Sequence, residues 1–211
     1  MQWDFTKEFA FLELAQQLKM ELRHCWYKDG RRESVAEHSW RLSLMILRLG
    51  EHLDQKVDIL KCLKMAVIHD LPEAIAGDVP VTQQDQNRKR LKELAELEAM
   101  KQIKALLNDD SGDEIFALWM EFEEQVTYES KFIKALDKLE AFIQHVEAPL
   151  ATWEQVEKQM PFEDKWLLAH CRFDSYLSAF AEDVNRKCIE KLLAAGENIE
   201  SLRATALKVA A

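Results

Sequence analysis

The sequence predicts an all-α protein, and three observations support this. Gly and Pro are scarce, at 5 and 4 of 211 residues, which is too few for a turn-rich β architecture. Apolar residues recur at helical spacing along most of the chain, and no segment shows sustained alternation. The composition, 48% hydrophobic and 31% charged, is ordinary for a globular protein with a sizeable core. We therefore expect a single domain over residues 1–211, since no linker marks a boundary near 150.

The first two helices are predicted on either side of a loop. Apolar residues recur at helical spacing over 4–22, and 23–32 is expected to be a loop. Ser34 and Glu37 have the spacing of a capping box, in which each side chain accepts a hydrogen bond from the backbone amide of the other residue. A second helix is predicted to begin there and to run over 35–52.

A third helix, over 55–70, is apolar almost all round near its end and should be central. Pro72 stops it, and 72–80 is expected to be irregular. A second capping box at Thr82–Asp85 is expected to start the next helix. The remaining helices are predicted near 82–107, 113–124, 129–147, 163–195 with a possible break, and 198–209.

Charge and cysteine content exclude several classes of protein. The net charge of −10 comes from acids spread along the chain, and such a surface repels nucleic acid and anionic lipid. No apolar run reaches the ~18 residues of a membrane span, and the N-terminus lacks the pattern of a signal peptide. Four cysteines without a C-x-x-C pair indicate free thiols in a reducing compartment. We expect a cytoplasmic protein that binds neither nucleic acid nor membrane.

His69 and Asp70 form the first candidate site. They follow the apolar run 65–68, and burying an imidazole beside a carboxylate is costly unless something compensates. A divalent cation compensates both, since neutral imidazole and carboxylate are metal ligands. The alternative is an ordinary helix C-terminus, where the histidine favours the helix dipole but the aspartate opposes it. That conflict favours the metal interpretation.

Asp137 lies at the margin of a predicted apolar stripe. On spacing alone, an exposed acid paired with Lys134 or Lys138 is the better interpretation, because exposed acids are the norm.

Two segments extend the argument, 33–41 (ESVAEHSWR) and 69–80 (HDLPEAIAGDVP). In their residues, order and separation they resemble segments of the HD-domain phosphohydrolases, in particular of the 5′-deoxynucleotidase branch. The resemblance covers about 10–147 and implies an HD-domain helical bundle, to which 150–211 would add C-terminal helices.

The resemblance also implies roles for particular residues. His38, His69, Asp70 and Asp137 match the four metal ligands, which reverses the interpretation of Asp137. Glu73 and Asp78 match catalytic positions, with the assignment of acid and base open. The implied substrate contacts are Arg23, Trp26, Asp78, Val79 and Pro80.

The implied function is hydrolysis of the 5′-phosphate of ribo- or deoxyribonucleoside monophosphates. The mixed nitrogen and oxygen ligands suit one divalent ion, with Mn, Co, Fe, Ni or Zn favoured over Mg or Ca. Arg23 can donate two hydrogen bonds to a phosphate. A homodimer is expected from the resemblance alone. The alternatives are an HD-type hydrolase of another phosphate ester or nucleotide, and a catalytically inactive helical scaffold that binds partners.

Overall fold

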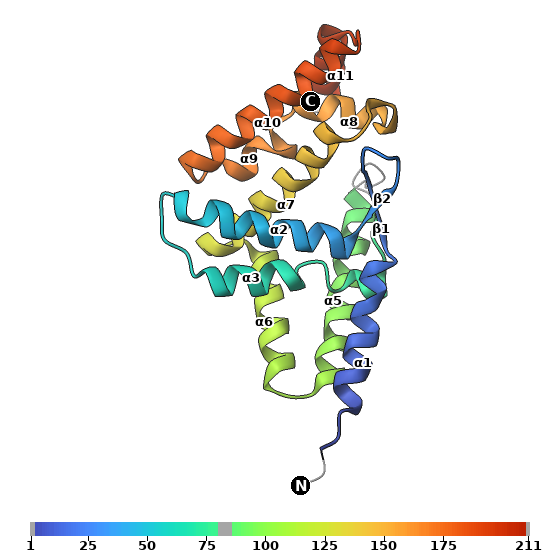
Figure 1. The fold of residues 1–211 in the computed structure, drawn as a ribbon, viewed down its shortest axis with the longest axis vertical. Helices are drawn as coiled ribbons and strands as arrows, with labels where there is room; N and C mark the ends of the chain where they lie inside the picture. The colour runs from blue at the N-terminus through green and yellow to red at the C-terminus, as the bar shows by residue number, and fades with distance from the viewer. Residues whose placement is uncertain (1–2, 80–85, 210–211) are drawn as a thin grey trace.

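Helices form most of the chain in the computed structural model, which describes residues 3–79 and 86–209 (Figure 1). The all-α prediction is confirmed. In chain order the α-helices are α1 Thr6–Ala15, α2 Val35–Leu49, α3 Ile59–Ile68, α4 Glu73–Ala76, α5 Gln86–Leu107, α6 Asp110–Glu124, α7 Tyr128–Glu147, α8 Gln155–Gln159, α9 Leu168–Cys171, α10 Ser175–Ala194 and α11 Ile199–Val209. Short 3₁₀ segments lie at Gln16–Lys19, Gly50–His52, Leu150–Thr152, Met160–Phe162 and Asp164–Trp166. The predicted capping box at Thr82–Asp85 lies outside the described residues.

The predicted loop over 23–32 is wrong, because it contains most of a β-hairpin. Strand β1, Leu22–Trp26, pairs antiparallel with β2, Arg32–Ser34. The turn between them includes Gly30 at a φ of +84°, a conformation that favours glycine. Strands of five and three residues are too short for alternation to be recognised in the sequence.

The predicted first helix, over 4–22, is also too long. Regular α-helix covers Thr6–Ala15 and is followed by the 3₁₀ segment Gln16–Lys19. On α1, Phe9 and Leu12 are 73% and 63% exposed, while Phe11 and Leu14 are partly buried against apolar side chains of the rest of the chain. Helical spacing identified the helix correctly, but it does not show that the apolar face is buried within this chain.

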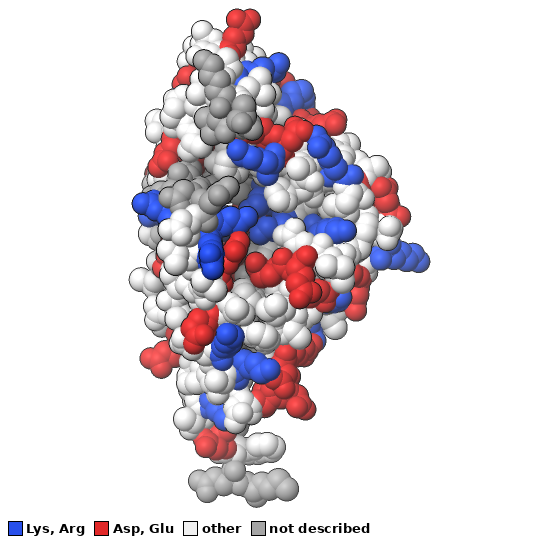
Figure 2. All heavy atoms as spheres, turned by 180° about the vertical axis from the view of Figure 1, so that it is seen from behind, with Lys and Arg blue, Asp and Glu red and all other residues white. Residues whose placement is uncertain are grey.

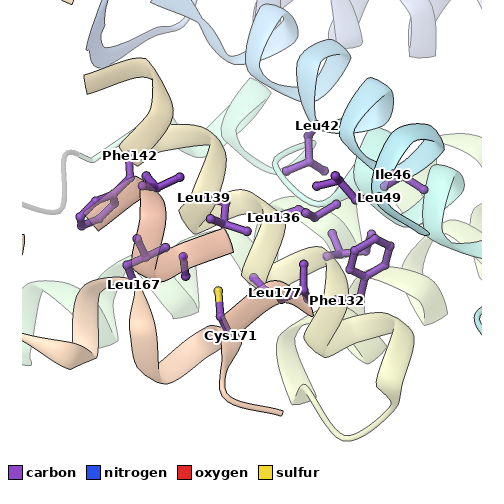
Figure 3. Packing of buried hydrophobic residues seen from close by; sticks show 14 of the residues in the cluster. Leu42, Ile46, Leu49, Phe132, Leu136, Leu139, Phe142, Leu167, Cys171 and Leu177 are labelled. Atoms are coloured by element: carbon purple, nitrogen blue, oxygen red, sulfur yellow. The ribbon is translucent and has the colours of Figure 1, made fainter. Parts of the chain in front are cut away.

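The core forms around α7, which packs against α2, α3, α6, α9 and α10. Figure 3 shows side chains from α2, α7 and the C-terminal helices meeting in this core. The helices α8–α11 lie at the end of the molecule opposite the N-terminus (Figure 1). They contribute Leu167, Cys171 and Leu177 to the same core, so the C-terminal segment is continuous with the rest of the domain.

The surface carries both signs of charge despite the net charge of −10. Figure 2 shows Lys and Arg side chains near the middle of the rear face, next to acidic ones. Within 3–79 and 86–209, no helix has both the length and the apolar character needed to cross a bilayer.

Truncation of Leu136 tests the central position of α7. This residue is fully buried in the core, so Leu136→Ala should lower the free energy of unfolding by about 2–5 kcal/mol, measured by urea denaturation. Leu60 on α3 is 63% exposed and supplies a matched control, for which Leu60→Ala should cost less than about 0.5 kcal/mol. Equal losses for the two variants would contradict this description of the core.

Candidate functional site

His38 lies in the first turn of α2, where the predicted capping box is present. The Ser34 Oγ accepts a hydrogen bond from the Glu37 amide at 3.3 Å, and Glu37 Oε2 accepts one from the Ser34 amide at 2.9 Å. The His38 side chain is fully buried, and its Nδ1 donates to Glu140 Oε2 at 2.6 Å. This contact leaves His38 Nε2 as the atom that faces the rest of the cluster.

His69 and Asp70 follow the last residue of α3. The His69 Nδ1 donates to the Ala66 carbonyl at 2.8 Å, so its Nε2 is left for another partner. That Nε2 lies 3.2 Å from Asp70 Oδ2, and the same carboxylate oxygen lies 3.8 Å from His38 Nε2. Arg23 Nη1, at 3.3 Å from Asp70 Oδ2, offsets the unfavourable position of this acid at a helix C-terminus.

Asp137 comes from the third turn of α7 and is buried. Its Oδ1 lies 3.4 Å from His38 Nε2, while its Oδ2 pairs with Lys134 at 3.5 Å and Lys138 at 3.2 Å. The pairing with Lys134 and Lys138 that spacing alone favoured is therefore present, but the acid is buried rather than exposed. Burial opposes its ionisation, but the two lysines and His38 lower the pKa of Asp137 well below its ordinary value.

The geometry of these side chains fits a divalent metal ion. One ligand atom each from His38, His69 and Asp137 lies within 4.8 Å of the others. Atoms that bind one ion at about 2.0–2.2 Å are separated by at most about twice that distance, so small movements would suffice. Among the described residues, neither His38 Nε2 nor His69 Nε2 has a hydrogen-bond partner. Buried imidazole nitrogens without partners are costly, and an ion bound between them removes that cost.

Two buried acids support the cluster and were not identified from the sequence. Glu140 contacts His38 and also lies 3.6 Å from Arg41 Nη1, while Glu33 Oε2 lies 3.3 Å from Arg23 Nε. Burial and the charge of Glu140 raise the pKa of Glu33 to about 7. Glu140 follows Asp137 by three residues on α7, a spacing that puts both on one face of a helix and is a usable sequence signal.

A cavity of about 780 Å³ opens beside the cluster and is lined by Arg23, His69, Asp70 and Asp137. The predicted residues Glu73, Asp78 and Val79 line it too. Glu73 begins α4 and is nearly buried, and its Oε1 accepts a hydrogen bond from Lys92 at 3.1 Å. Burial and the nearby Asp70 raise the pKa of Glu73 well above its ordinary value, and burial also raises that of Asp78.

Among the described residues, one predicted substrate contact, Trp26, does not line the cavity. Trp26 ends β1, packs edge-on against His24, and is not among the residues that line the cavity. Arg23, His24 and Cys25 on the same strand all line the cavity, so the lining stops one residue before Trp26. Pro80 lies outside the described residues.

A helical bundle that brings two histidines and two aspartates together beside a cavity has the ligand types that a divalent metal ion needs. The model of the HD domain matches residues 15–165 of this sequence. The chain belongs to the HD domain family. The sequence-based resemblance to this family is confirmed.

Curated relatives are similar to this chain over part of its length. The human 5′-deoxynucleotidase HDDC2 is 38% identical over 139 residues, which make up 65% of this chain and 66% of that protein. The zebrafish (Danio rerio) protein of the same name is 40% identical over 136 residues, covering 64% and 66%. Yeast (Saccharomyces cerevisiae) 5′-deoxynucleotidase YGK1 is 29% identical over 146 residues, covering 66% of each chain. The matched region is thus just under two thirds of the length of these relatives.

Solved structures extend the similarity to the C-terminal helices. A predicted metal-dependent phosphohydrolase from Magnetospirillum magnetotacticum has a TM-score of 0.74 at 28% identity, covering 89% of this chain and 93% of that one. A conserved hypothetical protein from Pyrococcus furiosus has a TM-score of 0.55 at 35% identity, covering 66% and 83%. Much of the region beyond residue 150 therefore has a counterpart in the Magnetospirillum protein.

Proton release on metal binding tests the cluster. Burial and Arg23 oppose protonation of His38, but Glu140 and Asp137 outweigh them and raise its pKa to about 10 in the metal-free protein. An ion must displace that proton, so its affinity should rise by about tenfold per pH unit between pH 6.5 and 9. Calorimetry with Mn²⁺ or Co²⁺ in buffers of different ionisation enthalpy measures the protons released.

The variant Glu140→Gln supplies the comparison. It removes a carboxylate that raises the pKa of His38, so fewer protons should leave at pH 8. Binding without any proton release in the unmodified protein would contradict the proposed contact between His38 and the ion.

Proposed function

We propose that this protein is a metal-dependent phosphohydrolase that removes the 5′-phosphate from ribo- or deoxyribonucleoside monophosphates. The observation that carries the proposal is the meeting of His38, His69, Asp70 and Asp137 beside a cavity that Arg23 also lines. The names of the curated relatives support the substrate class, since they are 5′-deoxynucleotidases.

The four residues would hold one divalent ion, through His38 Nε2, His69 Nε2 and a carboxylate oxygen each from Asp70 and Asp137. Both imidazoles are oriented by their Nδ1 contacts, His38 by Glu140 and His69 by the Ala66 carbonyl. When bound, the ion would polarise a phosphate oxygen and make water a nucleophile near neutral pH. Mn, Co, Fe, Ni or Zn suit this mixed ligand set better than Mg or Ca.

Arg23 would bind the phosphate. Its guanidinium lies 3.3 Å from both Asp70 Oδ2 and Glu33 Oε2, so its position is fixed before substrate arrives. In an acidic protein it supplies the local positive charge that an anion needs. Its guanidinium can donate two hydrogen bonds to two phosphate oxygens. Val79 and Pro80 are proposed to contact the phosphate end of the substrate.

Glu73 and Asp78 would move protons. Burial raises the pKa of each acid and so favours its protonated form relative to the same acid in water, which suits a group that gives and takes a proton. One would accept a proton from the attacking water and the other would give one to the leaving alkoxide. Lys92 orients Glu73 by the contact to Oε1, and Glu73 Oε2 has no partner among the described residues.

Trp26 is retained as a weaker proposal. It does not line the cavity, but its backbone carbonyl accepts a hydrogen bond from Gln144 Nε2 at 2.6 Å, which ties the hairpin to α7. Its effect on substrate would then act through the position of Arg23 on the same strand.

We also propose a homodimer in the cytoplasm. Three large apolar side chains, Trp40, Leu44 and Leu47, are exposed one turn apart on α2 and provide a surface for a second copy. The four cysteines are buried free thiols, as is usual in a reducing compartment.

Phosphate release from dAMP and AMP tests the proposed activity. The protein loaded with Mn²⁺ or Co²⁺ should hydrolyse both monophosphates, and Asp137→Asn should lower kcat/KM at least about 100-fold. This loss should exceed the loss of about 10–100-fold in activity that is typical when only a residue hydrogen-bonded to a metal ligand is replaced. The matched control is Asp113→Asn, an exposed aspartate on α6 that does not line the cavity, and its activity should be unchanged.

The same assay separates the alternatives. Phosphate release from other esters or triphosphates alone would favour a different HD-type hydrolase. Protein that binds no ion and releases no phosphate from any ester would favour the inactive scaffold and would overturn the proposal.

A further inference from the structure

The cavity continues well beyond the proposed metal ligands along one face of α7. Asp137, Lys138, Ala141, Phe142 and His145 all line it, and their spacing of three or four residues places them on one side of the helix. Eight residues separate Asp137 from His145, which corresponds to about 12 Å at 1.5 Å per residue. The space therefore has a far end, at roughly the distance that separates the phosphate of a nucleotide from its base.

The polar groups at this far end include His145, Glu157 and His24. Both ring nitrogens of His145 face acceptors, with Nδ1 at 2.7 Å from the Ala141 carbonyl and Nε2 at 2.9 Å from Glu157 Oε1. A histidine that donates from both nitrogens carries a positive charge. Burial works against that charge, but contacts with Cys25 and Glu157 raise the pKa of His145 well above its ordinary value.

Glu157 retains the capacity to accept further hydrogen bonds. Glu157 is 3% exposed. Its Oε2 accepts a hydrogen bond from the Glu154 amide at 2.6 Å in the capping box of α8. Glu157 Oε1 also lies 3.4 Å from His24 Nε2. A carboxylate offers about four lone-pair sites, and the three contacts to His145, Glu154 and His24 use at most three of them. Since His145 donates both its protons elsewhere, the far end of the cavity presents mainly acceptors to a ligand.

Apolar side chains of the C-terminal segment wall this end. Trp153, Met160, Pro161 and Trp166 line the cavity around Glu157. Trp153 is fixed by its Nε1, which donates to the His145 carbonyl at 3.0 Å. Flat apolar walls around a few oriented polar groups are typical of a site for a planar ring with a polar edge.

We infer that the far end of this cavity binds the nucleobase of the substrate, and that Glu157 accepts a hydrogen bond from an exocyclic amino group. The inference rests on the proposed function, because the phosphate must lie at the metal cluster for the base to reach Glu157. Cytosine and adenine carry such an amino donor, whereas uracil and hypoxanthine present a carbonyl at the same position. A carbonyl facing a carboxylate has no hydrogen to share and leaves both acceptors unpaired.

Pairs of substrates that differ only at this group give the sharpest test. The metal-loaded protein should hydrolyse dCMP with a kcat/KM roughly 10–100-fold higher than that for dUMP, and AMP should exceed IMP similarly. Equal values within each pair, or a preference for dUMP and IMP, would overturn the inference whatever the variants do.

The variant Glu157→Gln replaces one carboxylate oxygen by a donor of similar size. It should bring the dCMP to dUMP ratio close to one. Glu154→Gln is the matched control, because Glu154 is next to Glu157 in the same capping box but does not line the cavity, and its ratio should stay that of the unmodified protein. Retention of the full preference in Glu157→Gln would contradict the assignment.

Binding of nucleosides without phosphate separates this inference from the proposed activity. Calorimetry should show tighter binding of deoxycytidine than of deoxyuridine, with the difference lost in Glu157→Gln. If no monophosphate is hydrolysed, the proposed function fails, while the nucleoside comparison still decides the role of Glu157. Equal binding of the two nucleosides would overturn that role.

Discussion

The structure depends on one constraint, the burial of two imidazoles and two carboxylates at a single point. Such groups are costly to remove from water unless each finds a partner. His38 and Asp137 approach each other from α2 and α7, and His69 with Asp70 arrives from the end of α3. A divalent ion bound among them would satisfy all four at once and offset the cost of placing them beside the cavity.

Charges around this point are balanced by a second layer of buried groups. Glu140 holds His38 by its Nδ1, and Arg23 lies between Asp70 and Glu33. Lys134 and Lys138 pair with one oxygen of Asp137 and leave the other directed toward His38. Each ionisable group is thus oriented by a neighbour of opposite charge, and the geometry of the cluster is set before any ligand binds.

Such a layout also explains why the activity proposed here suits an acidic protein. Long-range repulsion of a phosphate by the net charge of −10 is offset locally by Arg23 and by the ion itself. The C-terminal helices then complete the cavity with Trp153 and the His145–Glu157 pair. All three residues lie within the part of the chain that matches the HD domain family.

The sequence predicted the helical fold and singled out the residues of the cluster, because both leave local signals. The capping box at Ser34 and the apolar run before His69 are short-range patterns with a direct physical cause. Asp137 was recovered only by resemblance, since its spacing alone also fits an exposed acid, and it indeed contacts two lysines.

The sequence did not predict the contacts between distant parts of the chain. The Glu140–His38 pair joins residues 102 apart, and no local pattern marks Glu33 as buried. The hairpin was missed because its strands are short, and the exposed Phe9 shows that helical spacing alone does not determine what a helix packs against. The wall formed by Trp153 depends on how the C-terminal helices return to α7, which only the fold determines.

Anomalous diffraction from crystals grown with Mn²⁺ or Co²⁺ tests the central claim most directly. The account predicts one strong peak bounded by His38 Nε2, His69 Nε2 and the carboxylates of Asp70 and Asp137, with Glu140 still in contact with His38 Nδ1. A peak elsewhere in the protein, or a cluster that stays empty at saturating ion while Asp137 keeps its lysine contacts alone, would contradict it.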